Sequence, residues 1–241
     1  MVATEILKAT PGAVITQFFM AFCCASAIFF LKKVPLEKSP NKRILMTFWT
    51  ICYGFFTITA ISWISLLFGY PKVAENFAIP SAMFIIAEVI SAVYYIVSIA
   101  TNNKIIKRTI LAIIFSIAIF FVVLTLVGSR IQQRDDMPFL VLPTVIPEGT
   151  LIFIFIAFTL IFSIVIFRRD LRSGKFSFYH PESFYEFYAV MIYGALIGIR
   201  ILYFLPRLSL VDIFFVFIPA LMYLRARPYL IKKNKNVDIR S

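Results

Sequence analysis

PGAVITQFFMAFCCASAIFFLKK, residues 11–33, contains 21 consecutive uncharged residues followed by two lysines. A mostly apolar run of about 20 residues is long enough for a helix to cross the hydrocarbon core of a bilayer. A signal peptide has a shorter apolar core, and cleavage after Ala25-Ser26-Ala27 would cut inside this run. Lys32 and Lys33 are instead typical of a stop-transfer sequence. We therefore expect a first transmembrane helix here.

The same kind of run recurs along the whole chain of 241 residues, of which 61% are hydrophobic and 15% charged. A soluble domain of this size could not bury so much apolar surface. The sequence therefore predicts an all-α membrane protein, a single seven-transmembrane-helix bundle spanning 1–241 with a short basic tail over 226–241. The predicted helices are 11–31, 44–70, 79–100, 107–127, 149–167, 184–205 and 209–225.

The net charge of +12 is distributed unevenly among the segments between these runs. Of the 24 lysines and arginines, 18 lie in alternate segments, which are 32–43, 104–108, 168–175 and 225–240. The positive-inside rule then places the N-terminus outside and the C-terminus inside the cell. The basic excess predicts contact with anionic lipid headgroups at the cytoplasmic face and no nucleic-acid binding. We expect an integral, multi-pass protein of the cell membrane.

A faint repeat relates the first helices to the last at an offset of 136 residues, with Pro11 matching Pro147 and Lys32-Lys33 matching Arg168-Arg169. Two interpretations stay open: parallel repeats in a 3+1+3 arrangement, as in many transporters, or chance matches between apolar segments. In helix count and orientation, this layout resembles that of SWEET sugar transporters and microbial rhodopsins. The last predicted helix has no lysine to form a retinal Schiff base, which argues against a retinal pigment.

Few ionisable residues lie inside the predicted helices, and three of them are expected at similar depths below the outer face. Arg200 lies six residues before Pro206 and Asp212 six after it, about 9 Å below a turn at that proline. Glu88, eight residues after Pro80, would lie about 12 Å deep. Opposite charges in lipid offset each other's desolvation, so we expect these three side chains to meet.

Two tyrosines share faces with these charges, because Tyr95 follows Glu88 by seven residues and Tyr193 precedes Arg200 by seven. The pattern predicts a polar interior open toward the outer face, able to hold a small polar ligand, an ion or a proton path. The alternative is a self-satisfied structural network in which Arg200 extends toward the headgroups and the tyrosines serve packing alone.

Other residues predict how the helices pack and bend. Gly194 and Gly198 form a GxxxG pattern, on which a second helix can pack closely. Pro219 removes a backbone hydrogen bond from the last predicted helix and is a candidate hinge. We expect no metal and no cofactor, since the chain has one histidine and its three cysteines lie inside predicted helices.

Three functions are compatible with this pattern. The first is a small-solute or ion transporter or permease, which a repeat would favour. The second is a seven-helix receptor or sensor that signals to a separate partner. The third is a non-catalytic subunit of a larger membrane complex, which would bind a partner subunit in the membrane. We do not expect an enzyme, because no paired nucleophile and base and no Gly-rich phosphate loop appear.

Overall fold

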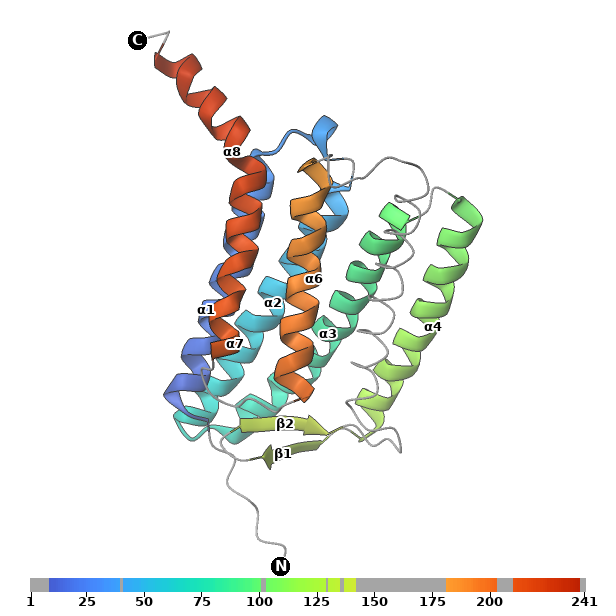
Figure 1. The fold of residues 1–241 in the computed structure, drawn as a ribbon. Coiled ribbons are helices and arrows are strands. Elements are labelled where there is room, and N and C mark those ends of the chain that lie inside the picture. The colour runs from blue at the N-terminus through green and yellow to red at the C-terminus, as the bar shows by residue number, and fades with distance from the viewer. Residues whose placement is uncertain are drawn as a thin grey trace, which may run out of the picture.

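The computed structural model describes residues 9–39, 41–100, 103–128, 130–134, 137–141, 181–202 and 210–238, most of them helical (Figure 1). The α-helices are α1 (Pro11–Lys33), α2 (Lys42–Leu67), α3 (Pro71–Ala100), α4 (Lys104–Gly128), α6 (Pro181–Leu202), α7 (Leu210–Ile213) and α8 (Phe217–Asp238). Two 3-10 turns and two strands join them, namely η1 (Leu36–Lys38), η3 (Phe214–Val216), β1 (Arg130–Arg134) and β2 (Met137–Val141).

The long helices form one antiparallel bundle, in which α1, α3 and α8 run in one direction and α2, α4 and α6 in the other (Figure 1). Helix α1 packs against α2 and α8, α3 packs against α2 and α4, and α6 packs against α8. We call the end where α1 stops at Lys33 and α2 starts at Lys42 the basic end, and the opposite end the hairpin end. Lys104, at the start of α4, also lies at the basic end (Figure 1).

Three helical stretches are long and apolar enough to cross a membrane, namely Pro11–Lys33, Lys42–Leu67 and Phe214–Ile231. Two shorter apolar stretches, Met83–Ile99 and Phe184–Ile197, lie in α3 and α6. On α1, the exposed residues Ile15, Phe18, Phe22 and Phe29 recur at helical spacing and form an outward apolar face. Soluble proteins rarely expose such a surface, whereas lipid chains would cover it. The chain therefore has the features of a membrane protein.

A tight turn between α2 and α3 shifts both predicted helix boundaries. The predictions were 44–70 and 79–100, but α2 ends at Leu67 and α3 begins at Pro71. Gly69 adopts φ 80°, and the Tyr70 N–H donates to the Ser65 carbonyl at 2.8 Å, which closes the end of α2. Proline is favoured in the first turn of a helix, so Pro71 starts α3 at once. Pro80 consequently lies inside α3 instead of at its beginning.

Several other segments differ from the predicted helices and loops. The predicted last helix ended at residue 225, but α8 continues to Asp238 and includes much of the predicted tail. The segment 128–148, predicted as a loop, contains the antiparallel hairpin β1–β2. The predicted helix 149–167, and with it the possible repeat, lies outside the described residues.

The main core lies between α1, α2, α3, α6 and α8 and is rich in aromatic side chains. Trp49, Phe48, Phe56, Tyr95 and Phe215 are its largest fully buried members. In the middle of α1 the core-facing residues Cys23, Cys24 and Ala27 are small and buried. Small side chains on this helix leave space that large rings of the neighbouring helices fill.

Candidate functional site

The predicted site residues occupy buried positions wherever the structure describes their side chains. Glu88 is 8% exposed, while Tyr95, Tyr193 and Asp212 are 1%, 3% and 0% exposed. Arg200 belongs to α6, but its side chain lies outside the described part of the chain. Four of the five predicted residues are therefore interior, although they do not all meet at one place.

The predicted site residues lie at different depths in the bundle, as their positions along the helices show. Glu88 lies 12 residues before the end of α3 at Ala100, and Tyr193 lies 12 residues after the start of α6 at Pro181, so both are about 18 Å from the basic end. Because α3 starts at Pro71, Glu88 is about 26 Å from the hairpin end, not the 12 Å expected.

The two remaining charges lie closer to the hairpin end. Arg200 is seven residues beyond Tyr193 on α6, a rise of about 10 Å toward that end. Asp212 is the third residue of α7, near the same end (Figure 1). The helix positions therefore separate Glu88 from the level of Arg200, and the Arg200–Asp212 pair stays a prediction.

Aromatic side chains surround Tyr193 in the middle of the bundle. Its ring centroid lies 5.4 Å from that of Phe48, 5.6 Å from Trp49 and 6.0 Å from Phe215. The three ring pairs are nearly perpendicular, which is a favourable edge-to-face geometry. This packing holds the tyrosine ring in one position and directs its hydroxyl to a defined place.

The Glu88 carboxyl lies beside that hydroxyl. It is close enough to interact electrostatically with Tyr193 and with the thiol of Cys52 on α2. Cys24 on α1 interacts with the same thiol and hydroxyl. Four helices thus each contribute a polar or ionisable group to one buried place, which we call the Glu88 cluster (Cys24, Cys52, Glu88 and Tyr193).

Several buried polar atoms in the interior of the bundle lack a hydrogen-bond partner among the described residues. They are the Tyr193 and Tyr95 hydroxyls, Trp49 Nε1 and Gln17 Oε1. A buried polar group without a partner costs about 1–3 kcal/mol, so native interiors contain few of them. Three of them, on Trp49, Tyr95 and Tyr193, belong to the main core, where water or a polar solute would supply the missing hydrogen bonds.

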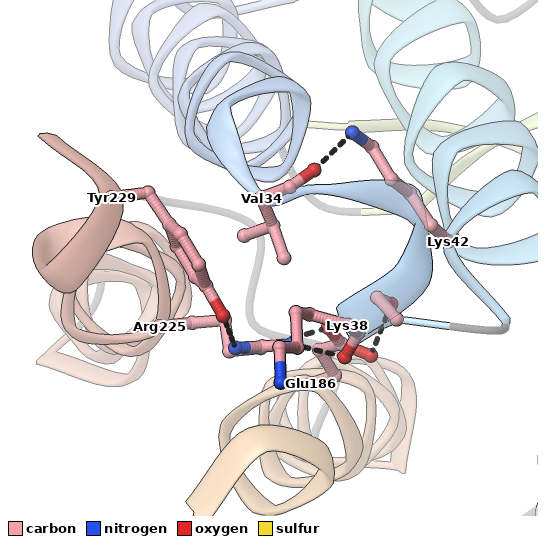
Figure 2. Close-up of polar contacts among 7 residues, drawn as sticks. Val34, Lys38, Lys42, Glu186, Arg225 and Tyr229 are labelled. Carbon is pink, nitrogen blue, oxygen red and sulfur yellow. Dashed lines mark hydrogen bonds and ion pairs between the residues drawn. The ribbon is translucent and has the colours of Figure 1, made fainter. Parts of the chain in front are cut away.

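A second polar group lies at the basic end and centres on an ion pair between α6 and α8 (Figure 2). Arg225 Nε donates to Glu186 Oε1 at 3.1 Å, and both side chains are almost fully buried. The other carboxylate oxygen of Glu186 accepts a hydrogen bond from Ser39 Oγ at 3.0 Å. Arg225 Nη2 donates to the Lys38 carbonyl at 2.7 Å, and Nη1 donates to the Tyr229 hydroxyl at 3.5 Å.

These contacts fasten the α1–α2 connection to the other helices. Arg225 and Glu186 hold residues 38 and 39, while Lys42 Nζ donates to the Val34 carbonyl (Figure 2). The same Nζ donates to the Lys32 carbonyl at 3.2 Å. The last carbonyls of a helix lack intrahelical partners, and a lysine there satisfies them and suits the helix dipole. The basic end is thus a connected polar cap.

Tyr95 lies between the two polar groups. It follows Glu88 by seven residues on α3, about 10 Å nearer the basic end. Its hydroxyl is close enough to interact electrostatically with both Glu186 and Arg225. Interior polar groups therefore extend from the middle of the bundle to the polar cap.

The sequence pattern does not predict the Glu186–Arg225 pair. Glu186 lies seven residues before Tyr193, on the same face of α6, and Arg225 is one of the basic residues of the segment 225–240. Both lie near the same ends of two predicted helices, a signal that could have suggested the pair. Their lateral proximity, however, depends on which helices are neighbours.

The structure describes the surroundings of Gly194 and Pro219 but not those of Gly198. Gly194 is buried. A close helix approach occurs at Gly54, where an added methyl group would collide with the Phe84 ring.

Pro219 lies in the first turn of α8, three residues after the 3-10 helix η3 ends at Val216. This break in the regular helix is expected because proline removes a backbone donor. Motion about Pro219 stays a prediction.

In the described segments, no group of three or more His, Cys, Asp or Glu side chains is arranged to hold a metal ion. No protein-family model matches the sequence, and no curated protein is significantly similar to it.

Proposed function

We propose that this membrane protein is a small-solute or ion transporter whose binding site is the Glu88 cluster. The observation that carries the proposal is a buried carboxyl group in the middle of the bundle, in an interior where other buried polar atoms have no hydrogen-bond partner among the described residues. Ionisable residues inside membrane helices are costly and commonly mark substrate or ion pathways.

The groups available suit a small polar solute. The Tyr193 hydroxyl and the indole N–H of Trp49 can donate hydrogen bonds, and the Gln17 amide oxygen can accept one. The rings of Phe48 and Phe215 pack around Tyr193 and provide apolar walls. Binding sites for small molecules are typically mostly apolar with a few placed polar groups. The predicted opening toward the outer face stays a prediction, because residues 203–209 lie outside the described chain.

Net uptake into proteoliposomes tests the proposal. The solutes would be a neutral sugar, a zwitterionic amino acid, a monocarboxylate and a potassium salt, each radiolabelled. We expect uptake of at least one above that of protein-free liposomes and its loss in Glu88→Gln. Glu75→Gln removes the same charge from an exposed position on the same helix and should transport like wild type. Equal uptake by Glu88→Gln and wild type would contradict a site at Glu88.

The two other functions give different results in the same preparation. A subunit of a larger complex should show no uptake of any of these solutes and should co-purify in mild detergent with a stable membrane partner. A sensor should bind one of the solutes, seen as a rise in thermal unfolding temperature, without moving it across the bilayer. Either pattern would replace the transport proposal.

A further inference from the structure

A row of aromatic side chains joins α1 to α8 on the outside of the bundle near the basic end. The two helices pack side by side and run in the same direction (Figure 1). Lys33 Nζ lies 4.9 Å from the centroid of the exposed Phe29 ring. The centroid of Phe30 is 5.5 Å from that of Phe29 and 5.4 Å from that of Tyr223 on α8, and both pairs meet edge to face. We call this surface, together with Arg227, the α1–α8 seam.

Two exposed cations, Lys33 and Arg227, lie at the same level of the seam. Lys33 follows Phe30 by three residues and Arg227 follows Tyr223 by four. Because the helices are parallel and these two rings are in contact, the cations lie about 4.5 and 6 Å beyond that contact, toward the basic end. Packed helices have axes about 8–10 Å apart, a separation that one phosphate group between two long cationic side chains can bridge.

The charges of these two residues are not used inside the protein. Other basic side chains nearby are engaged, since Arg225 is paired with Glu186 and Lys42 donates to carbonyl groups at the end of α1. In the part of the chain that the structure describes, neither Lys33 nor Arg227 forms an ion pair with a carboxylate. Both cations are therefore available to an anion from outside the molecule.

The position of the seam along α1 indicates what kind of anion it meets. Lys33 lies 22 residues beyond Pro11, about 33 Å along the helix, and the hydrocarbon core of a bilayer is about 30 Å thick. Lys33 is therefore expected at the level of the lipid headgroups. The exposed apolar face of α1, which includes Phe18 and Phe22, continues from Phe29 into the hydrocarbon. A free phosphate would contact only the cations, whereas the chains of a phospholipid also cover this face.

We propose that the α1–α8 seam binds an anionic phospholipid of the leaflet at the basic end. Its phosphate lies between Lys33 and Arg227, and its acyl chains lie against Phe29 and the outward face of α1. Tyr223 suits this interface, because a tyrosine places its ring in the lipid and its hydroxyl near the headgroups. The proposal narrows the general attraction expected from the basic excess to one site, and it does not depend on the transport function.

Lipid binding to the purified protein in a mild detergent, counted by native mass spectrometry, tests the proposal. The probes are dioleoylphosphatidylglycerol, which is anionic, and dioleoylphosphatidylcholine, which has the same chains and no net charge. One cation near a membrane surface strengthens the attraction to anionic lipid about fivefold. We expect Lys33→Gln and Arg227→Gln each to weaken binding of the first phosphatidylglycerol about fivefold, and the double variant about 25-fold. Binding of phosphatidylcholine should not change.

The matched control is Lys104→Gln combined with Arg108→Gln, which removes the same charge from exposed positions of α4 at the basic end. It should bind phosphatidylglycerol like wild type, because α4 packs against α3 and lies away from α1 and α8 (Figure 1). Without added lipid, all variants should unfold at the wild-type temperature. Added phosphatidylglycerol should raise this temperature in wild type and in the α4 control, but not in Lys33→Gln combined with Arg227→Gln.

Other results would overturn the proposal. Equal affinity of wild type for the two lipids, or an equal loss in the seam variants and the α4 control, would show only a general attraction between basic residues and anionic lipid. Displacement of the bound lipid by glycerol phosphate, which has no acyl chains, would indicate a site for free phosphates. A dimer that forms in wild type and is lost in the double seam variant would show that a second copy of the chain covers the seam.

Discussion

The ion pair between Glu186 and Arg225 should be among the most important polar contacts for the stability of this bundle. Its atoms are 3.1 Å apart, and the side chains are 3% and 5% exposed, so solvent screens the pair only weakly. With an effective dielectric constant of about 20, two unit charges at this distance attract by about 5 kcal/mol. Arg225→Leu removes that attraction and leaves a buried carboxylate. We expect it to lower the free energy of unfolding by about 3–5 kcal/mol.

The double variant Arg225→Leu with Glu186→Leu should be less destabilised than Arg225→Leu alone. Replacement of both charges by leucines avoids the isolated carboxylate and adds apolar contacts. Some cost remains, because the Lys38 carbonyl and the Ser39 hydroxyl lose their partners. An unpartnered buried group costs about 1–3 kcal/mol, so we expect a net loss of about 2 kcal/mol for the double variant.

Unfolding by sodium dodecyl sulfate in mixed micelles, followed by the fluorescence of Trp49 and Trp63, measures these free energies. Both tryptophans are buried in α2, so their emission should shift on unfolding. Arg227→Leu is the matched control, because Arg227 lies on the same helix and is exposed. A cost of less than about 1 kcal/mol for Arg225→Leu, or a double variant destabilised as much as Arg225→Leu alone, would refute this reasoning.

Two further comparisons use the same unfolding measurement. Gly54→Ala should destabilise the bundle by about 1–3 kcal/mol, because its methyl group meets the Phe84 ring, whereas Gly12→Ala, which meets no atom within 4 Å, should be neutral or stabilising by up to about 1 kcal/mol. A similar effect at both glycines would contradict a close α2–α3 contact. Arg200→Leu should destabilise more than Arg200→Leu combined with Asp212→Leu, since the single change leaves a buried carboxylate; equal stability would exclude the pair.

The membrane character of the chain could be predicted because it depends on local properties. Hydrophobic run length and the position of charged residues are read one segment at a time, as at 11–33. The boundary at Gly69 and Pro71 is also local, since these residues terminate and start helices by their own backbone preferences. The apolar residues up to position 70 and the proline at position 80 conceal this boundary in the sequence, because they also fit a longer first helix and a later start of the second.

The difference in depth between Glu88 and Arg200 has a similar cause. Depth was counted from Pro80, and a helix that starts nine residues earlier moves Glu88 by about 14 Å relative to its expected starting point. The match of Glu88 with Tyr193 in depth follows when depth is counted from the basic end, where α3 ends at Ala100 and α6 begins at Pro181. Burial of the individual residues, by contrast, was predictable from the cost of placing polar side chains in lipid.

The sequence alone predicts apolar helices long enough to cross a membrane, with basic residues at one end and a few polar residues facing inward. Only the tertiary structure shows that Ser39, Glu186 and Arg225 meet, although 147 residues separate the first two and 39 the last two. The reason is physical: these helices are apolar on nearly every side, so neither their rotation nor their neighbours are encoded by a hydrophobic face. Side-chain packing between helices decides both.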